Sequence, residues 1–395
     1  MSGLPREIYL PAPDGDTAQW MNVHYMDRDG TREEVLRLSS ASDTYVDWER
    51  RISTDNGRNF GPTTGIPDVV QRLPGGGLVT YPGGCDVDPV TGIRYELRMR
   101  RFWPGMEPFT FVWENHQHPF TDHCYVVEHH PDGTSREIFL RFEDGPDWNP
   151  DDPFAPDFAA ANQAYFGNGF AFTPDGSVYL PLVCHRTAGP DEHEAGVVLM
   201  RRRPEDATWG PSNCVHLQSL QSSRGLLEPD VAACKDGRLL VICRGSSTDV
   251  TPGHKWVTTS DDGGRTLAPV RELTWDDGTS FYSPSSIHRL QRSRRNGRLY
   301  WCANITEAAP DANGPRYPLY LAEIDEERIA VRRSSLVLVD DRREEDSKYL
   351  QLSNFSLLED IETDRFEIYI TRIGSNADQR WHAGVDRYVF EPPAP

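Results

Sequence analysis

The sequence predicts an all-β protein folded as a six-bladed β-propeller, and three observations support this fold class. The pattern Ser-x-Asp-x-Gly-x-x-(aromatic or Leu) occurs at residues 53–60 and again at 260–267. Six units, each with a strand, a turn and a second strand, follow one another along the 395 residues. The 32 Gly, 31 Pro and 10% aromatic residues favour short strands and tight turns over long helices.

The repeated pattern predicts a hairpin that is closed by its own side chains. Its Ser and Asp can bind turn amides, its Gly supplies a positive φ, and its last apolar residue packs under the neighbouring strand. One copy falls in the first unit and the other in the fourth, in matching surroundings. We therefore expect both copies to form the same outer hairpin.

The first three units begin near residues 20, 67 and 168, and each is recognised by short apolar runs on either side of a turn. The strands that we predict in them are 20–25 and 35–38, then 67–70, then 169–172, 178–183 and 197–201. A long insertion in the second blade, at about 84–160, is expected to rise over one face of the ring. There it would serve as a lid or a substrate platform, or form only an ordered surface loop.

The last three units begin near residues 228, 283 and 352. Their predicted strands are 228–233 and 239–244, then 283–288, 299–303 and 319–324, then 352–358, 366–371 and 388–390. Because a propeller must close its ring, we expect the segment 7–10 to supply the outer strand of the last blade. Residues 1–395 are thus predicted to form a single domain.

The net charge of −20, from 41 basic and 61 acidic residues, opposes non-specific binding to nucleic acids and to anionic membranes. The seven Cys are odd in number and form no Cys-x-x-Cys pair, so we expect buried, reduced thiols and no zinc site. The chain has no signal-peptide pattern at its start and no apolar run of about 18 residues. We therefore expect a cytoplasmic protein without membrane contact.

Polar residues at the starts of the innermost strands are expected to meet in one axial cavity, because these strands begin at the central channel. The residues at such positions are Glu228, Ser283, Ser285, His288 and Asn354, with Asp68 and Asn168 as further candidates. A binding or catalytic site is therefore predicted on the propeller axis.

The repeated pattern resembles the Asp box of sialidases and other BNR-repeat β-propellers, and the resemblance covers most of the chain. Sialidases carry the acidic partner of their nucleophile in a Glu-x-x-Val strand before Asp-Gly-Arg-Leu, and this chain has residues 228–231 before 236–239. By the same resemblance, Lys255 and Arg316 correspond to two of the three arginines that bind a sugar carboxylate. The resemblance implies that Glu228 is catalytic and that Lys255 and Arg316 bind substrate.

Two parts of the sialidase pattern are missing from this chain. The Arg-Ile-Pro start of the first blade is replaced by residues 20–24, and the nucleophilic Tyr corresponds to Phe355. A phenyl ring has no hydroxyl with which to attack an anomeric carbon. Sialoside hydrolysis by the usual route is therefore not the activity that we favour from the sequence.

Histidines and arginines near the insertion favour another reaction on an acidic sugar, β-elimination from a uronate. A lyase neutralises the carboxylate, removes the C5 proton and protonates the leaving oxygen, and His suits both proton transfers. Some sialidase-like propellers are rhamnose-glucuronate lyases, and this chain resembles that group in its missing Tyr and its many His and Arg. The predicted catalytic residues are His116, His118, His123, His185 and Glu228.

The predicted partner is an acidic oligosaccharide, attacked at its terminal sugar, and the oligomeric state is left open. The predicted substrate-binding residues are Arg186, Arg244, Lys255, Tyr282, His288, Arg316, Asn354 and Arg372. His116 and His118 could share one face of a strand and bind a metal, but no third ligand has a recognisable spacing. We predict no cofactor, with a structural or carboxylate-bridging metal such as calcium left open.

Two alternatives stand beside the lyase. The first is an exo-acting glycoside hydrolase of the sialidase type. The second is a non-catalytic glycan-binding propeller, which would explain the missing sialidase residues without new chemistry. Formation of an unsaturated uronate would support elimination, and release of free sialic acid without it would support hydrolysis.

Overall fold

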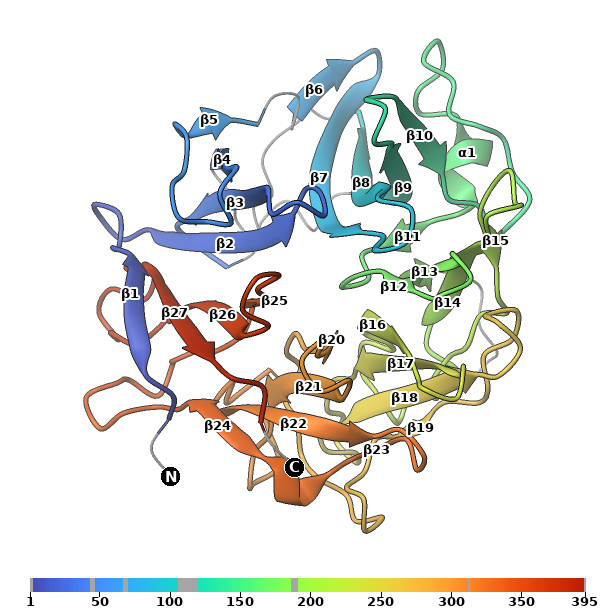
Figure 1. Ribbon diagram of the computed structural model, residues 1–395. Helices are drawn as coiled ribbons and strands as arrows, with labels where there is room; N and C mark the ends of the chain where they lie inside the picture. Colours follow the sequence, from blue (N-terminus) through green and yellow to red (C-terminus); the bar gives the residue numbers. More distant parts are fainter. Residues whose placement is uncertain are drawn as a thin grey trace.

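The protein is described by a computed structural model over residues 3–42, 47–66, 70–105, 119–185, 191–311 and 313–393. Within these ranges the strands form six sheets of four or five strands, arranged in a ring (Figure 1). This arrangement confirms the six-bladed β-propeller. The same ranges contain one short helix, α1 (Pro156–Ala160), and one 3₁₀ turn, η2 (Arg333–Ser335). None of the helical segments described could span a membrane.

The first three blades follow the chain in order. Blade 1 contains β2 (Ala18–Tyr25), β3 (Arg32–Ser39), β4 (Asp47–Ser53) and β5 (Thr64–Gly65). Blade 2 contains β6 (Val70–Leu73), β7 (Gly76–Val87), β8 (Arg94–Pro104), β9 (Thr121–His129) and β10 (Ser135–Phe139). Blade 3 contains β11 (Ala164–Tyr165), β12 (Ala171–Phe172), β13 (Val178–His185), β14 (Ala195–Arg202) and β15 (Gly210–Pro211).

The remaining blades complete the ring. Blade 4 contains β16 (Leu227–Ala233), β17 (Leu239–Arg244), β18 (Lys255–Ser260) and β19 (Arg271–Glu272). Blade 5 contains β20 (Arg289–Arg292), β21 (Leu299–Asn304), β22 (Leu319–Asp325), β23 (Ala330–Val331) and β24 (Val337–Asp340). Blade 6 contains β25 (Ser356–Glu359), β26 (Phe366–Thr371), β27 (Val385–Phe390) and β1 (Arg6–Leu10).

The first strand of the chain is the outer strand of the last blade. β1 pairs antiparallel with β27, with Arg6 opposite Tyr388 and Ile8 opposite Asp386. In Figure 1 the blue β1 lies directly beside the red β27. The sequence analysis predicted this outer-strand position for residues 7–10. The two ends of the chain are thereby joined in one sheet, so that neither end can leave without breaking backbone hydrogen bonds.

Most of the segment predicted as an insertion, residues 84–160, belongs to blade 2 itself. β7 continues to Val87, and β8, β9 and β10 pair in sequence behind it. Tyr95, Leu97 and Met99 are buried and alternate with more exposed residues, which is the period of a half-buried strand. The lid expectation is therefore wrong for residues 94–104 and 121–139.

The two Ser-x-Asp-x-Gly repeats fold alike. In the first, the Gly57 amide donates to Ser53 Oγ at 2.9 Å and the Asn59 amide donates to Asp55 Oδ1 at 2.8 Å. In the second, the equivalent amides of Gly264 and Thr266 donate to Ser260 Oγ at 3.0 Å and to Asp262 Oδ1 at 2.9 Å. Gly57 and Gly264 have φ of 81° and 79°, which a side chain would strain.

Apolar side chains fill the spaces between neighbouring blades. Ile242 of blade 4 packs in one cluster with Leu290 and Trp301 of blade 5. Tyr300 on the opposite face of blade 5 packs in another cluster with Ile368 of blade 6. Both faces of each sheet are thus covered, and the polar residues of the inner strands are left to line the axis.

The cysteines differ from the expectation of seven reduced thiols. Cys184 of β13 and Cys214 form a disulfide, and the other five cysteines are free and buried. The partners are 30 residues apart in sequence and meet across β14, because Cys184 of β13 is opposite Gly196 and the next residue, Val197, bridges Val215. Spacing alone could not reveal this contact, because it depends on the sheet register.

A buried ion network joins the first and last blades on the side of the first repeat. Arg32 donates from Nη1 to Glu367 at 3.0 Å and from Nε to Asn56 at 2.9 Å, and it also pairs with Asp360. The Arg32 side chain is 3% exposed. Since the two blades are the ends of the chain, this network supports closure of the ring.

Replacing Arg32 with Ala is expected to lower the free energy of unfolding by about 3–5 kcal/mol, because two buried carboxylates lose their cation. Urea unfolding followed by tryptophan fluorescence measures this difference. Arg58→Ala is the matched control, because Arg58 pairs with Glu362 between the same blades while 60% exposed. The control should cost less than about 1 kcal/mol. Equal losses in the two variants would contradict a role of burial in this network.

Candidate active site

A cavity of about 1680 Å³ lies on the propeller axis and is lined by residues of all six blades. Glu228, Asn168 and Asn354 line it, as expected from the starts of the inner strands. Eleven Arg and Lys side chains and six Asp and Glu side chains face this cavity. In a chain of net charge −20, the cavity is therefore a locally positive region.

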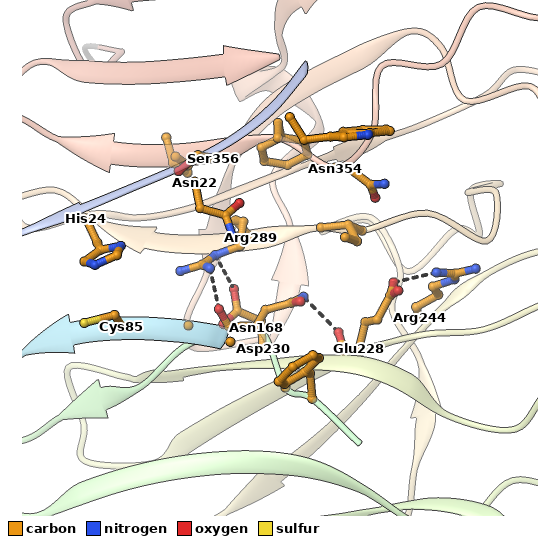
Figure 2. A pocket seen from close by; sticks show the side chains of 18 of the residues that line it. Asn22, His24, Cys85, Asn168, Glu228, Asp230, Arg244, Arg289, Asn354 and Ser356 are labelled. Atoms are coloured by element: carbon orange, nitrogen blue, oxygen red, sulfur yellow. Dashed lines mark hydrogen bonds and ion pairs between the residues drawn. The ribbon is translucent and has the colours of Figure 1, made fainter. Parts of the chain in front are cut away.

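Glu228 stands in the cavity wall at an irregular point of its strand. The register of β16 against β17 shifts between Leu227 and Asp230, and Glu228 has a positive φ of 43°. Asn168 donates from Nδ2 to the Glu228 carbonyl at 3.0 Å, which holds this backbone in place (Figure 2). A non-glycine residue at positive φ stores strain of about 1–3 kcal/mol, and such strain is typical of functional positions.

Two arginines are fixed beside Glu228 through the same residue, Ser285. Arg244 donates from Nη1 to Glu228 Oε2 at 2.6 Å (Figure 2). It also donates from Nε to Ser285 Oγ at 2.7 Å. Arg316 donates from Nη2 to the Ser285 carbonyl at 3.0 Å and from Nη1 to Gln351 Oε1 at 2.9 Å. The geometry therefore places two guanidinium groups and one carboxylate on one side of the cavity.

The surrounding charges keep Glu228 ionised. Burial alone would raise its pKa, but Arg244, Arg316 and Lys255 outweigh burial, and the pKa lies below the ordinary value of 4.5. At neutral pH Glu228 is consequently a carboxylate and cannot act as a proton donor. It can act as a base, as a nucleophile or as a stabiliser of positive charge.

Lys255, which the resemblance placed among the substrate-binding residues, does not line the cavity. Its side chain is completely buried, and Nζ donates to the carbonyls of Pro284 and Ser286 at 3.1 and 2.5 Å. Burial lowers its pKa well below the ordinary value. Lys255 therefore supports the 284–286 segment from behind, and that segment in turn carries Ser285.

The predicted histidine group is not assembled around the cavity. His116, His118 and Arg186 lie outside the described residues. His123 is buried against Phe158, with ring centroids 4.3 Å apart, and burial lowers its pKa to about 4. His185 does line the cavity, at the exposed end of β13. Of the described histidines in this group, only His185 is placed where it could meet a substrate.

Three further predicted residues also lie away from the cavity lining. His288 is fully buried, and its Nε2 lies 3.0 Å from the Ile242 carbonyl. Tyr282 packs against the ring of His254, with centroids 5.9 Å apart. Arg372 is 5% exposed and pairs with Asp340 and Asp346. These residues stabilise blades rather than bind a ligand on the axis.

Asn354 and Phe355, by contrast, both line the cavity. Asn354 has a positive φ of 56°, and Phe355 is 5% exposed. Phe355 thus lies in the cavity wall, where the resemblance to sialidases places a tyrosine. A nucleophile at this position is absent, so any chemistry on the axis depends on other side chains.

An ion pair that sequence reasoning missed lines the cavity on blade 2. Arg101 donates to both oxygens of Asp122 at 2.7 Å, and its guanidinium lies 3.9 Å from the centroid of the Phe120 ring. Arg101 and Asp122 are direct partners in the β8–β9 register. The alternating pattern of residues 94–104 was the available signal, and it was lost when this segment was interpreted as an insertion.

A second missed group lies around Arg289 (Figure 2). Arg289 Nε is 3.5 Å from Asp230 Oδ2, and that oxygen also accepts a bond from the Leu290 amide at 2.6 Å. Asp86 accepts a bond from the Phe170 amide at 3.1 Å. Burial raises the pKa of both carboxyl groups. These contacts tie the inner strands of four blades together.

Among the described residues, no group of three ligands could hold a metal ion.

Comparison with known proteins identifies the fold. No family model matches this chain, and no curated protein sequence matches it. A Dyadobacter fermentans protein of unknown function superposes with a TM-score of 0.61 at 11% identity, covering 100% of both chains. The intramolecular trans-sialidase of Ruminococcus gnavus, in complex with oseltamivir carboxylate, gives 0.56 at 12% identity and covers 98% of this chain and 96% of that one.

An arabinose-processing propeller is similar to the same extent. The α-L-arabinofuranosidase of Fusarium graminearum, in complex with arabinobiose, gives a TM-score of 0.53 at 12% identity, covering 98% of this chain and 96% of that one. At such identities these likenesses establish a shared propeller fold and leave the reaction to be argued from the site. The fold is the six-bladed β-propeller that the repeated pattern indicated.

Proposed function

We propose that this chain is an exo-acting glycoside hydrolase that removes a terminal sugar bearing a carboxylate. The observation that carries the proposal is the ionised Glu228 beside Arg244 and Arg316 in a cavity with an excess of five positive side chains. The protein as a whole is negatively charged and would repel an anionic substrate. The locally positive cavity can nevertheless attract such a substrate to the axis. Guanidinium groups suit a sugar carboxylate because they donate two parallel hydrogen bonds.

In this proposal Glu228 acts on the anomeric carbon. Cleavage of a glycosidic bond passes through an oxocarbenium-like transition state, whose positive charge a fixed carboxylate stabilises. Arg244 and Arg316 hold the substrate carboxylate and thereby orient the sugar ring. Arg244 has a second function, because its hydrogen bond fixes the Glu228 carboxylate in the ionised form.

The proposal departs from the uronate elimination that the sequence favoured. Elimination was assigned to a histidine group, of which His123 is buried away from the axis. Two of the three similar structures named above are an intramolecular trans-sialidase and an α-L-arabinofuranosidase, which are carbohydrate-active enzymes. The geometry and the comparisons therefore favour the sialidase-type alternative over the lyase.

A panel of fluorogenic glycosides tests the proposal. An α-sialoside and a β-glucuronide provide carboxylates, a neutral α-L-arabinofuranoside provides none, and a uronate disaccharide reports elimination through the absorbance of its unsaturated product. We expect hydrolysis of at least one acidic glycoside and none of the neutral one. Cleavage of only the neutral glycoside, a rise in unsaturated uronate, or binding without turnover would each overturn the proposal.

The pH dependence of turnover is a separate prediction. Because its neighbours hold the Glu228 pKa below 4.5, more than half of the carboxylate is still ionised at pH 4.5. We therefore expect the acid limb of kcat/KM to have its midpoint below pH 4.5. Initial rates measured with the folded state checked at each pH test this. An acid limb with a midpoint above pH 4.5 would assign the essential group elsewhere.

A further inference from the structure

A second cluster of reactive side chains lines the same cavity, on blades 1 and 2. His24 of β2 and Cys85 of β7 lie next to each other and away from Glu228 (Figure 2). The His24 Nε2 atom is 2.8 Å from Glu33 Oε2, and the imidazole also hydrogen-bonds the Cys85 thiol. Arg94 donates from Nη1 to Cys85 Sγ at 3.5 Å. The four residues form a Cys–His–Glu relay with an added guanidinium.

The relay holds His24 as a cation. Burial disfavours the charged imidazole, but Cys85 and Glu33 outweigh burial and raise the pKa of His24 to about 10. Three further charged groups interact electrostatically with these residues. Arg50 pairs with Glu33, Arg98 lies close enough to act on Cys85, and Asp86 acts on His24. Cys85 thus lies against an imidazolium and a guanidinium, the electropositive surroundings in which reactive cysteines are found.

The other free cysteines lack such surroundings. Burial raises the pKa of Cys234 to about 12, and it also raises those of Cys124, Cys243 and Cys302. Of the five free cysteines, Cys85 is the one that lines the axial cavity. At 6% exposure it can be reached only by a small reagent. Both the partners and the position therefore single out Cys85.

We propose that Cys85 is a modification site for small peroxides, with His24 as the proton donor. The Cys85 thiolate attacks one oxygen of the peroxide, so that an S–O bond forms as the O–O bond breaks. The sulfur is oxidised by two electrons to a sulfenic acid, and the peroxide is reduced. With hydrogen peroxide the leaving group is hydroxide, which takes the His24 proton and departs as water. Hydrogen peroxide is neutral and small enough for a nearly buried thiol.

The rate of oxidation of the native protein by hydrogen peroxide tests the proposal directly. After timed exposure, the remaining thiol at each cysteine is labelled in denaturant and quantified by peptide mass spectrometry. We expect Cys85 to be oxidised at least about tenfold faster than each of the other four free cysteines. Equal rates at all five would overturn the proposal.

Two variants separate the relay from general effects of mutation. His24→Gln removes the imidazolium and should slow oxidation of Cys85 at pH 6 at least about tenfold. His254→Gln is the matched control, since His254 is also buried and paired with a glutamate, Glu272 at 3.2 Å, but lies outside the cavity lining. The control should leave the rate unchanged. Equal rates in His24→Gln and the native protein would overturn the proposal. If that variant fails to fold, the comparison among the five free cysteines of the native protein still decides.

Discussion

Replacing Glu228 with Gln is expected to lower kcat on an acidic glycoside by about 10³-fold, the largest effect that we predict for any single substitution. The amide has nearly the same shape, so it can still accept the hydrogen bond that Arg244 donates at 2.6 Å. It carries no negative charge to stabilise an oxocarbenium-like transition state. Because binding groups are retained, KM should change little. Steady-state kinetics on the acidic glycosides of the panel measure both constants.

Glu128→Gln is the control for this loss. Glu128 is likewise paired with an arginine, Arg202, at 2.5 Å, but its side chain is 1% exposed against 17% for Glu228, and it does not line the cavity. Both substitutions remove one carboxylate charge from an ion pair, and the more deeply buried Glu128 should cost at least as much stability. A similar loss of kcat in both variants would mean that Glu228 acts only on the fold, and the proposed chemistry would fail.

The fold could be predicted because its signals are local. The turn in each unit and the period of its strands require no knowledge of distant contacts, and blade 4 therefore appears with nearly its predicted strands, 228–233 and 239–244. Blade 2 was harder, because β8 and β9 were interpreted as part of an insertion. The error was one of assignment, since buried and more exposed residues alternate regularly from Arg94 to Arg101.

The site was predictable only in part, because a position on an inner strand does not determine where a side chain points. Glu228 and Arg316 line the cavity as their resemblance implied, whereas Lys255 turns behind the wall to meet two backbone carbonyls. The pair of Arg101 and Asp122 depends on the β8–β9 register, which no local pattern supplies. The contact of His24 with Cys85 likewise joins two blades and becomes visible only in three dimensions.

The second large effect concerns Arg244, whose replacement by Met should lower kcat/KM on an acidic glycoside by about 10²-fold. Met keeps much of the buried volume but donates no hydrogen bond to Glu228 or Ser285. Without its nearest cation, the Glu228 carboxylate is held less strongly in the ionised form, so its pKa should rise. The acid limb of the pH profile should therefore move to higher pH in this variant.

Arg372→Met separates this effect from a general loss of stability. Arg372 is similarly buried and is paired with two carboxylates, Asp340 and Asp346, outside the cavity lining. Arg372→Met should lower the free energy of unfolding at least as much as Arg244→Met does. It should not shift the acid limb of the kcat/KM profile. A shift of the limb in Arg372→Met, or an unmoved limb in Arg244→Met, would contradict the assignment. A purely structural arginine has no means of changing the titration of Glu228, and this makes the pH profile more decisive than the rate alone.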